Sequence, residues 1–464
     1  MEILLINPPS KASNPIMPLG LAYLAVSLEN AGIPVEVIDA WAEGYSFERL
    51  ERELARKNPD IVGITMMSPF YGAAMRTVDA ARANTKAKIV VGGAHPSAVP
   101  AECLRDNSGI DFAVIGEGER TLVELAKAIF EGRKDTSAIK GLAFRQGGKI
   151  ITTLRSDAVE DLDILSPPAR HLFPTKKYRT HPPYGKENPY MTLITSRGCP
   201  FQCTYCSKSV FGSKYRFMSP AKVLWEIKHI KKNYGVKELH FYDDDFTMDM
   251  NRAEEICDLL KAQNVDISWS CTTRVDLVNR RLLEKMKASG CWLISYGIES
   301  ADEGVLKKIK KGYTTEDVKR AFSLTKNVGI RTAGFFMVGL PGETRRSLKK
   351  TIEFSLDLDP DFVSWGITAL YPGSPLYDSL NLRYHPEIKK GHASGSPYGD
   401  GYALIYEDTL SRRELEEYVK EANRLFYLRP LYLLRFVFKI RSFREFLHYL
   451  KGGFKTLFWM LRGR

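Results

Sequence analysis

The chain has 464 residues, more than a single hydrophobic core usually organises, and its 44% hydrophobic and 26% charged residues are typical of a globular protein. Seven cysteines, three of them clustered, do not form the pattern of a secreted disulfide framework and favour a reducing cytosol with a metal at the cluster. No apolar run reaches about 18 residues and no signal-peptide pattern opens the sequence. We therefore expect a cytoplasmic protein of two or three domains without a membrane span.

Residues 1–135 alternate short apolar runs with amphipathic stretches of helix length. The expected strands are residues 2–6, 34–39, 61–65, 88–93 and 112–116, and the stretches between them include 19–31 and 70–84. Near-continuous apolar strands that alternate with helices predict a doubly wound, Rossmann-like parallel sheet in an α/β domain.

Small, polar and turn-forming residues follow the strands of this first domain. Ligands of doubly wound sheets bind beyond the carboxyl ends of the strands. The candidate cofactor contacts at this edge are Asn7, Thr65, Gly92, Gly93, His95, Gly116 and Glu117. We therefore expect one face of the domain to bind a cofactor.

The rest of the chain begins with a connection at 136–190 and continues with a second β/α series. The connection holds an expected hairpin at 141–153, followed by a Pro-rich polar stretch. The series has expected strands at 191–196, 238–243, 267–273, 293–299, 331–339 and 362–370 and helices at 220–234, 251–263, 279–289, 315–327 and 344–357. Six strands with five helices predict a partial (βα)6 barrel over residues 191–375, with its chemistry at the carboxyl ends of the strands.

The segment TSRGCPFQCTYCS holds three cysteines with the spacing C-x3-C-x2-C: Cys199, Cys203 and Cys206. Three thiolates suit zinc or an iron–sulfur cluster. A structural zinc site normally has four protein ligands, and no further Cys or His pair stands nearby at zinc-finger spacing. An iron–sulfur cluster with one iron free of protein ligands fits the spacing better. The alternative is three incidental cysteines in a loop.

Within this segment, RGCPFQCTYCS has an aromatic residue before its last cysteine and resembles the signature of the radical S-adenosylmethionine (SAM) superfamily. The resemblance implies a [4Fe–4S] cluster held by Cys199, Cys203 and Cys206, with SAM chelating the open iron through its amino and carboxylate groups. It also implies reductive cleavage of SAM to a 5′-deoxyadenosyl radical, with an electron donor such as flavodoxin or ferredoxin.

Later strand ends extend this resemblance. The stretch YDDDFT is similar to the acidic motif after the second barrel strand, which implies that Asp243 and Asp244 reach the SAM amino group. YGIES and FFMVGLPGET resemble the motifs of the fourth and fifth strands, which makes Glu299 a further candidate. Arg274, after the third strand, is a candidate partner of the SAM carboxylate. The alternative is that Asp243–Asp245 cap the next helix.

The first domain resembles the cobalamin-binding (B12) domain that precedes many radical SAM domains, on the segments MPLGLAYLAVSLENAG, GGAHPS and GEGE. Together the two domains resemble the family of class B radical SAM methyltransferases and anaerobic magnesium-protoporphyrin cyclases. The D-x-H-x-x-G motif, which supplies a histidine to cobalt in many B12 enzymes, is absent: His95 has Gly93 at the position of the Asp. We therefore expect cobalamin without that histidine ligand, and His95 in the role of holding its Gly-Gly loop. Loss of the corrinoid is the alternative.

Residues 376–464 form the expected C-terminal extension, and its end is basic. The chain carries a formal charge of +12, and residues 429–464 contain nine Lys or Arg and one Glu. Arginines interleave with bulky apolar residues, a pattern typical of amphipathic helices at the inner face of a membrane, with breaks at Pro430, Ser442 and Gly452-Gly453. Helices packed on the barrel with solvated arginines are the equal alternative. Nucleic acid is disfavoured because no recognition fold accompanies the charge.

The resemblance to these two domains implies, as a first hypothesis, an enzyme that abstracts hydrogen from an unactivated carbon of a small hydrophobic substrate (a lipid, isoprenoid or tetrapyrrole) and transfers a methyl group to it from cobalamin. A second hypothesis keeps the radical step but cyclises or rearranges a tetrapyrrole or hopanoid. Methylthio transfer needs the cysteines of a second cluster, whereas the remaining four are scattered and suit packing: Cys103, Cys257, Cys271 and Cys291. A third hypothesis is a cobalamin- or nucleic-acid-binding module with a non-catalytic cluster.

Overall fold

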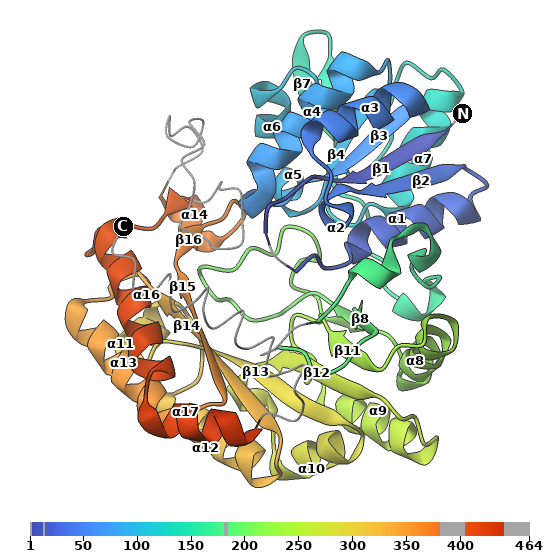
Figure 1. Ribbon diagram of the computed structural model, residues 1–464. Coiled ribbons are helices and arrows are strands. Elements are labelled where there is room, and N and C mark those ends of the chain that lie inside the picture. The colour runs from blue at the N-terminus through green and yellow to red at the C-terminus, as the bar shows by residue number, and fades with distance from the viewer. Residues whose placement is uncertain (1, 13, 181–183, 381–403, 440–464) are drawn as a thin grey trace. The chain divides into compact units, whose positions relative to one another are not determined.

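The computed structural model describes residues 2–12, 14–180, 184–380 and 404–439 (Figure 1). The chain divides into two compact units. The first unit contains Met1–Tyr178, Ser196–Met218 and Ala369–Leu404, and the second contains Arg179–Thr195, Ser219–Thr368 and Ile405–Arg464. The segment with the three clustered cysteines therefore groups with the first unit, although the sequence pattern places it inside the barrel.

The first unit is built on a seven-stranded sheet with the strand order β2-β1-β3-β4-β5-β6-β7. Its strands are β1 (Ile3–Asn7), β2 (Val35–Asp39), β3 (Ile61–Thr65), β4 (Lys88–Gly92), β5 (Phe112–Val114), β6 (Leu142–Gln146) and β7 (Lys149–Thr152). The pairs from β2 to β5 are parallel, whereas β5–β6 and β6–β7 are antiparallel. The doubly wound sheet and the hairpin are confirmed, and the hairpin extends this sheet instead of connecting two domains.

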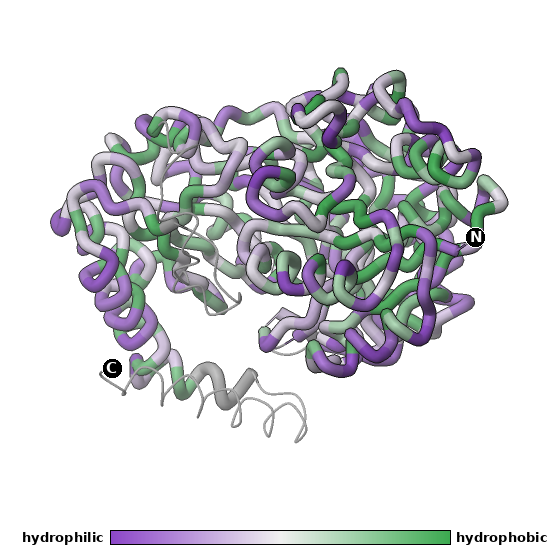
Figure 2. The backbone as a smooth tube through the Cα atoms, turned by 90° about the horizontal axis from the view of Figure 1, so that it is seen from above, coloured by the Kyte–Doolittle hydropathy of each residue, from purple (hydrophilic) through white to green (hydrophobic). Residues whose placement is uncertain are grey.

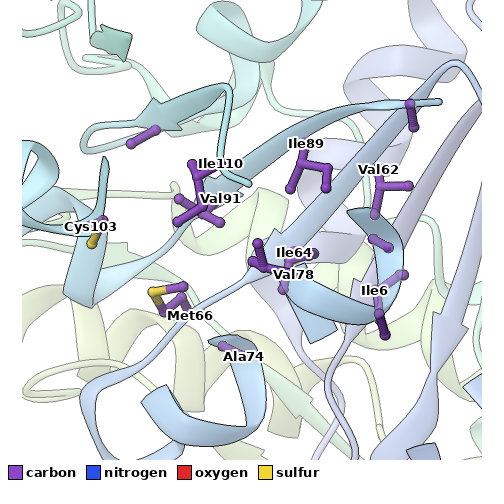
Figure 3. Packing of buried hydrophobic residues seen from close by; sticks show 14 of the residues in the cluster. Ile6, Val62, Ile64, Met66, Ala74, Val78, Ile89, Val91, Cys103 and Ile110 are labelled. Atoms are coloured by element: carbon purple, nitrogen blue, oxygen red, sulfur yellow. The ribbon is translucent and has the colours of Figure 1, made fainter. Parts of the chain in front are cut away.

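Helices accompany the strands of the first unit and bury the sheet on both faces. They are α1 (Leu19–Asn30), α2 (Ala40–Glu43), α3 (Phe47–Lys57), α4 (Tyr71–Asn84), α5 (Ala94–Ala98), α6 (Pro100–Asp106), α7 (Glu119–Phe130) and, late in the chain, α14 (Pro375–Ser379). The four residues Ile3–Ile6 are all buried, although alternate side chains of a strand point to opposite faces. On one face Ile6, Val62 and Val91 pack with Val78 of α4 (Figure 3).

The second unit is built on a six-stranded sheet with the strand order β15-β14-β13-β12-β11-β8, and every neighbouring pair is parallel. Its strands are β8 (Tyr190–Leu193), β11 (Glu238–Phe241), β12 (Ser268–Thr273), β13 (Cys291–Glu299), β14 (Arg331–Val338) and β15 (Phe362–Ile367). Strands β8 and β15 form the two edges, so the expected partial (βα)6 barrel is confirmed as an open one.

Helices alternate with these strands, and capping residues in the sequence set their starts. They are α8 (Pro220–Tyr234), α9 (Met250–Ala262), α10 (Arg280–Ala288), α11 (Glu303–Lys308), α12 (Thr315–Asn327) and α13 (Arg345–Leu358). Ser219 caps α8 and is followed by Pro220, a residue whose fixed φ favours the first helical position. Thr314 caps α12 in a capping box with Asp317. The six-residue helix α11 was not expected, because its pattern is too short to show helical periodicity.

The described chain ends with helices α16 (Arg412–Tyr427) and α17 (Pro430–Lys439) in the second unit. The start of α17 at Pro430 confirms the first expected break; Ser442 and Gly452-Gly453 lie outside the described residues. Arg429 ties this region to the barrel, donating from Nη2 to Asp359 Oδ1 at 2.8 Å and from Nη1 to the Leu356 carbonyl at 3.0 Å.

Hydrophilic and hydrophobic residues alternate along the C-terminal helices (Figure 2). Leu431, Leu433 and Leu434 at the start of α17 are exposed. Across the part of the chain that the structure describes, no helix combines the length and the apolarity needed to cross a bilayer.

Glu238 is a buried carboxyl group at the start of β11. It accepts hydrogen bonds from the backbone N–H groups of Lys186 and Glu187 and from Trp292 Nε1. Burial raises the pKa of Glu238 to about 7, although these donors oppose the rise. A carboxyl whose pKa is higher in the folded than in the unfolded protein stabilises the fold at low pH, and this contribution is lost as the pH rises through the folded value.

We predict that Glu238 stabilises the folded, metal-free protein at low pH. This contribution to the free energy of unfolding is complete below about pH 4.5 and lost by about pH 8, and Glu238→Gln removes it. The size of this contribution is on the order of 3 kcal/mol. Urea unfolding across this pH range, followed by circular dichroism, measures it. The control is Glu255→Gln, an exposed carboxyl on α9. Parallel pH profiles for wild type and Glu238→Gln would contradict the prediction.

Candidate active site

The strand order of the first unit creates a topological switch point between β1 and β3, the position at which such sheets bind ligands. Asn7 ends β1, Thr65 ends β3 and Gly92 ends β4, so these predicted cofactor contacts meet at one sheet edge. Asn7 Nδ2 donates to Asp39 Oδ1 at 2.8 Å, and the Tyr178 hydroxyl donates to Asp39 Oδ2 at 2.6 Å. Burial raises the pKa of Asp39, and its hydrogen-bond donors, the Ala42 N–H, Tyr178 and Asn7, oppose the rise. The edge is therefore held by a buried network.

The loop after β4 is fixed by Gly93 and His95. Gly93 has a φ of 111°, and an added Cβ would lie 2.9 Å from the Met66 carbonyl oxygen, so no other residue fits. His95 Nδ1 lies 3.0 Å from Ser68 Oγ, and its ring packs on Tyr71 with centroids 4.5 Å apart. Burial lowers the pKa of His95 to about 4, which keeps the imidazole neutral. His95 is thus a packed residue that holds this loop.

The turn after β5 carries Gly116 and Glu117. The Glu117 carboxylate is buried between two arginines, with 2.6 Å from Oε2 to Arg197 Nη1 and 2.6 Å from Oε1 to Arg216 Nη2. Arg197 Nη2 also contacts Glu119 Oε1 at 2.7 Å. Burial opposes the charge of Arg197, but the two glutamates raise its pKa above the ordinary value. Glu117 therefore binds the chain itself, a role that the sequence pattern does not reveal; its expected contact with cobalamin stays a prediction.

The cysteine loop is closed at its base by two short strands, β9 (Ser196–Arg197) and β10 (Arg216–Phe217), which pair antiparallel. Within the loop, the Cys199 N–H donates to the Gly212 carbonyl at 3.4 Å and the Cys206 N–H to the Cys203 carbonyl at 3.2 Å. Cys203 is buried, Cys199 is partly exposed and Cys206 is exposed, and none of them forms a disulfide. The three thiols thus belong to one loop that its backbone folds back on itself.

The donor set of this loop fits an iron–sulfur cluster. Three free thiols are soft ligands of the kind that such clusters take, and the remaining cysteines are buried elsewhere: Cys103, Cys257, Cys271 and Cys291. Within the described ranges, no three Cys, His, Asp or Glu side chains lie close enough to form a finished metal-ligand shell. The loop therefore supplies the chemistry of three ligands.

Asp243 and Arg252 both bind Thr195 within the second unit. The Asp243 carboxylate accepts from the Thr195 N–H at 2.6 Å and from Thr195 Oγ1 at 2.5 Å, and Arg252 Nη2 donates to the Thr195 carbonyl at 3.0 Å. Thr195 directly precedes β9. Asp244 is exposed. The cap of α9 is Asp249, so the alternative that Asp243–Asp245 cap this helix is wrong.

Arg274 and Glu299, the two further candidates for SAM contacts, lie in one charged network. Arg274 contacts both carboxylate oxygens of Asp276 at 2.9 Å and donates to the Lys311 carbonyl at 2.8 Å. Glu299 pairs with Lys311 Nζ at 2.8 Å, and the Arg274 guanidinium stacks on the Tyr313 ring. Glu299 also has a φ of 68°, which is strained for a residue with a side chain. Sequence reasoning missed Lys311 and Tyr313 because no motif marks them.

Gly198 is the residue on which the shape of the cysteine loop depends most directly. It has a φ of 87°, and an added Cβ would overlap the Lys214 carbonyl oxygen. Gly212 in the same loop also has a positive φ of 72° but has nothing within 4 Å of an added Cβ. The two glycines separate the effect of steric overlap from that of backbone conformation.

We predict that Gly198→Ala loses most of the iron bound after anaerobic reconstitution, because the loop must move to relieve the overlap with Lys214. Gly212→Ala pays only the conformational cost, roughly 1–2 kcal/mol, and keeps its iron. Iron and sulfide analysis of the two variants, with circular dichroism as a check on folding, tests this. Equal iron in both variants would show that the close approach of Gly198 to the Lys214 carbonyl is unimportant for cluster binding.

Comparisons with known proteins bear on both units. Residues 193–355 match the Radical SAM superfamily, and residues 10–126 match the B12 binding domain. The chain is 33% identical to an uncharacterized methyltransferase of Pyrococcus horikoshii, over 96% of each chain. It is 30% identical to the anaerobic magnesium-protoporphyrin IX monomethyl ester cyclase of Rubrivivax gelatinosus, over 96% of this chain and 80% of that protein.

A solved structure has the same architecture. The radical SAM methyltransferase TsrM from Kitasatospora setae, with cobalamin and a [4Fe–4S] cluster bound, superposes with a TM-score of 0.72 over 93% of this chain and 89% of that one. The identity is 20%, so this likeness concerns the fold. The two domain matches and the sequence relatives show the family. The chain belongs to the radical SAM enzymes with a B12-binding domain, whose cofactors are a [4Fe–4S] cluster, SAM and cobalamin.

Proposed function

We propose that the enzyme transfers a methyl group to an unactivated carbon of a hydrophobic substrate. The observation that carries the proposal is that the cysteine loop and the corrinoid-type sheet edge belong to one compact unit. With its cofactors bound, such a unit combines a 5′-deoxyadenosyl radical, which abstracts hydrogen, with a corrinoid, which carries the methyl group. The chain's own residues bind and orient these groups.

In this proposal Cys199, Cys203 and Cys206 hold the cluster, and the fourth iron stays open for SAM. Asp243 holds Thr195, the residue before the loop, in place, and its two hydrogen bonds to Thr195 support this role. An electron donor such as flavodoxin or ferredoxin supplies the reducing electron, because cleavage of SAM requires one.

The methionyl end of SAM carries one positive and one negative group, so its site needs both signs of charge. The network of Arg274, Lys311 and Glu299 offers both, and all three side chains are buried. We assign the SAM carboxylate to Arg274 and the SAM amino group to Glu299 and the exposed Asp244. Buried charges act more strongly on a ligand than exposed ones.

We assign cobalamin to the carboxyl edge of the first sheet, with Asn7, Thr65, Gly92 and Gly116 among its contacts. The close approach of Gly93 to the Met66 backbone supports a loop shaped for a ligand at this edge. His95 contributes through packing, because its Nδ1 contacts Ser68 and its ring is neutral.

The substrate class that we propose is a lipid, an isoprenoid or a tetrapyrrole. The cyclase relative is named for a magnesium-protoporphyrin ester, a large apolar ring. The exposed Leu431, Leu433 and Leu434 beside basic residues support a peripheral contact between α17 and an anionic membrane, where such substrates gather.

Radical cyclisation without methyl transfer is the second candidate function. The 30% identity to the cyclase of Rubrivivax gelatinosus, over 96% of this chain, favours it. The two functions share the radical step and differ in whether the SAM methyl group leaves for the substrate.

We predict that the reconstituted wild type, reduced with dithionite, cleaves SAM to 5′-deoxyadenosine, and that Cys203→Ala loses both this product and the brown colour of the cluster. Cys103→Ala is the matched control, because Cys103 lies in the core of the same unit outside the loop. Chromatography of the products gives the answer. Retained cleavage in Cys203→Ala would end the cluster assignment.

We also predict that the wild type binds about one cobalamin per chain with the spectrum of a cobalt that lacks a nitrogen ligand below the ring, and that His95→Gln has the same spectrum. The reason is that the His95 imidazole is already engaged by Ser68 and Tyr71. Absorbance spectroscopy with added hydroxocobalamin measures both points. A nitrogen-ligated spectrum that disappears in His95→Gln would make His95 the cobalt ligand.

A further inference from the structure

The base of the cysteine loop is clamped by one carboxylate. Glu117 lies between Arg197 of β9 and Arg216 of β10, and these are the two strands that close the loop. The side chains of all three residues are less than a tenth exposed. Glu117 is far from both arginines in the sequence and comes from the turn after β5. The position of the loop base is therefore fixed by the edge of the sheet.

Both arginines of the clamp also contact other groups of the first unit. Arg216 also donates to the carbonyls of Val159 at 2.7 Å and Phe211 at 3.2 Å. Arg197 lies near the faces of the Tyr23 and Phe211 rings, 5.1 and 5.2 Å from their centroids. Removing one charge from a buried pair leaves the other uncompensated, which is far more costly than losing an exposed pair.

The acidic residues of the clamp also lie at the N-terminus of a helix, where the helix dipole favours negative charge. Glu117 and Glu119 flank the start of the 12-residue helix α7, whose N-terminus favours negative charge. The helix N-terminus and the arginines therefore both favour acidic residues at these two positions. An amide at position 117 loses both interactions while it keeps the shape of the side chain.

A second set of contacts holds the far side of the loop within the same unit, and one of them reaches the sheet edge. Ser209 Oγ donates to the Ala94 carbonyl at 2.9 Å, and Ala94 follows the Gly92-Gly93 turn after β4. Arg155 Nη2 donates to the Ser209 carbonyl at 2.6 Å, and the Leu376 N–H donates to the Thr204 carbonyl at 2.8 Å. The loop thus touches the turns after β4 and β5, which carry the candidate corrinoid contacts.

We propose that Glu117 is a positioning residue that couples the cluster loop to the corrinoid edge, so that a corrinoid bound at this edge stabilises the cluster. The inference rests on the proposed function, because it takes cobalamin as the ligand of the edge and a cluster as the ligand of the loop. Its physical basis is that a ligand which orders the turns after β4 and β5 also orders Ala94 and Glu117, and through them the loop.

The test compares Glu117→Gln with Glu160→Gln. Glu160 forms an exposed ion pair with Lys214 of the same loop, at 2.5 Å, so its loss controls for charge removal at this segment. Each reconstituted protein is challenged with excess EDTA, with and without hydroxocobalamin, and loss of the cluster is followed by absorbance. The electron paramagnetic resonance spectrum of the dithionite-reduced cluster is recorded alongside.

In the wild type and Glu160→Gln we expect hydroxocobalamin to slow iron loss. In Glu117→Gln we expect iron loss to be at least about tenfold faster, since a buried ion pair is broken. We also expect the protection by hydroxocobalamin to vanish and the resonance spectrum to change. An unchanged circular dichroism spectrum of Glu117→Gln separates positioning from unfolding. If Glu117→Gln fails to fold, Arg216→Lys takes its place with the same expectations. Lysine keeps the positive charge but cannot contact Glu117 and the Val159 and Phe211 carbonyls together.

Equal iron loss and equal protection in Glu117→Gln and wild type would overturn the proposal. Faster iron loss in Glu117→Gln, without any protection by hydroxocobalamin in the wild type, would overturn the coupling. A wild type that binds a cluster but no hydroxocobalamin contradicts the proposed function instead, and the EDTA comparison alone then decides whether Glu117 holds the loop.

Discussion

Charge buried at the carboxyl ends of parallel strands must be neutralised within the protein, and the rest of this structure depends on how that is done. Removing an ion from water costs several kcal/mol even after relaxation, so a buried carboxylate persists only with hydrogen bonds or an opposite charge. Here Glu117 has two arginines, Glu299 has Lys311, and Asp39 has an amide and a hydroxyl. The networks of Glu117 and Asp39 join segments that are distant in the sequence, and all three lie at the carboxyl ends of strands, where ligands of such sheets bind.

In the proposed function the two units contribute different groups to one reaction. The first unit holds the cysteine loop and the corrinoid-type edge, so the spacing between their ligands is a property of one fold. The second unit holds Arg274, Glu299 and Lys311, whose mixed charges suit a zwitterion such as the methionyl end of SAM. Asp243 and Arg252 hold Thr195, the residue before β9, by hydrogen bonds within the second unit.

Most of the fold could be predicted from the sequence because its strands are short, nearly continuous apolar runs. The expected strand 61–65 and helix 220–234 coincide with β3 and α8, and Ser219-Pro220 marked the start of the latter. The cysteine spacing likewise indicated a cluster site with an open position. The partners of the candidate residues could not be predicted, because Glu117 and Arg197 lie 80 positions apart and nothing local marks the pair. For the same reason the grouping of the cysteine loop with the first unit depends on contacts that no periodicity encodes.

The central claim is that the radical and the methyl group serve one reaction. The measurement that tests it most directly uses SAM with a deuterated methyl group and the enzyme loaded with its cluster and hydroxocobalamin, under reducing conditions. Mass spectrometry of the extracted corrinoid decides the outcome. Methyl transfer predicts a trideuteromethyl group on cobalamin together with S-adenosylhomocysteine and, with an accepted substrate, 5′-deoxyadenosine. Formation of 5′-deoxyadenosine alone, with an unlabelled corrinoid, would contradict methyl transfer and favour cyclisation.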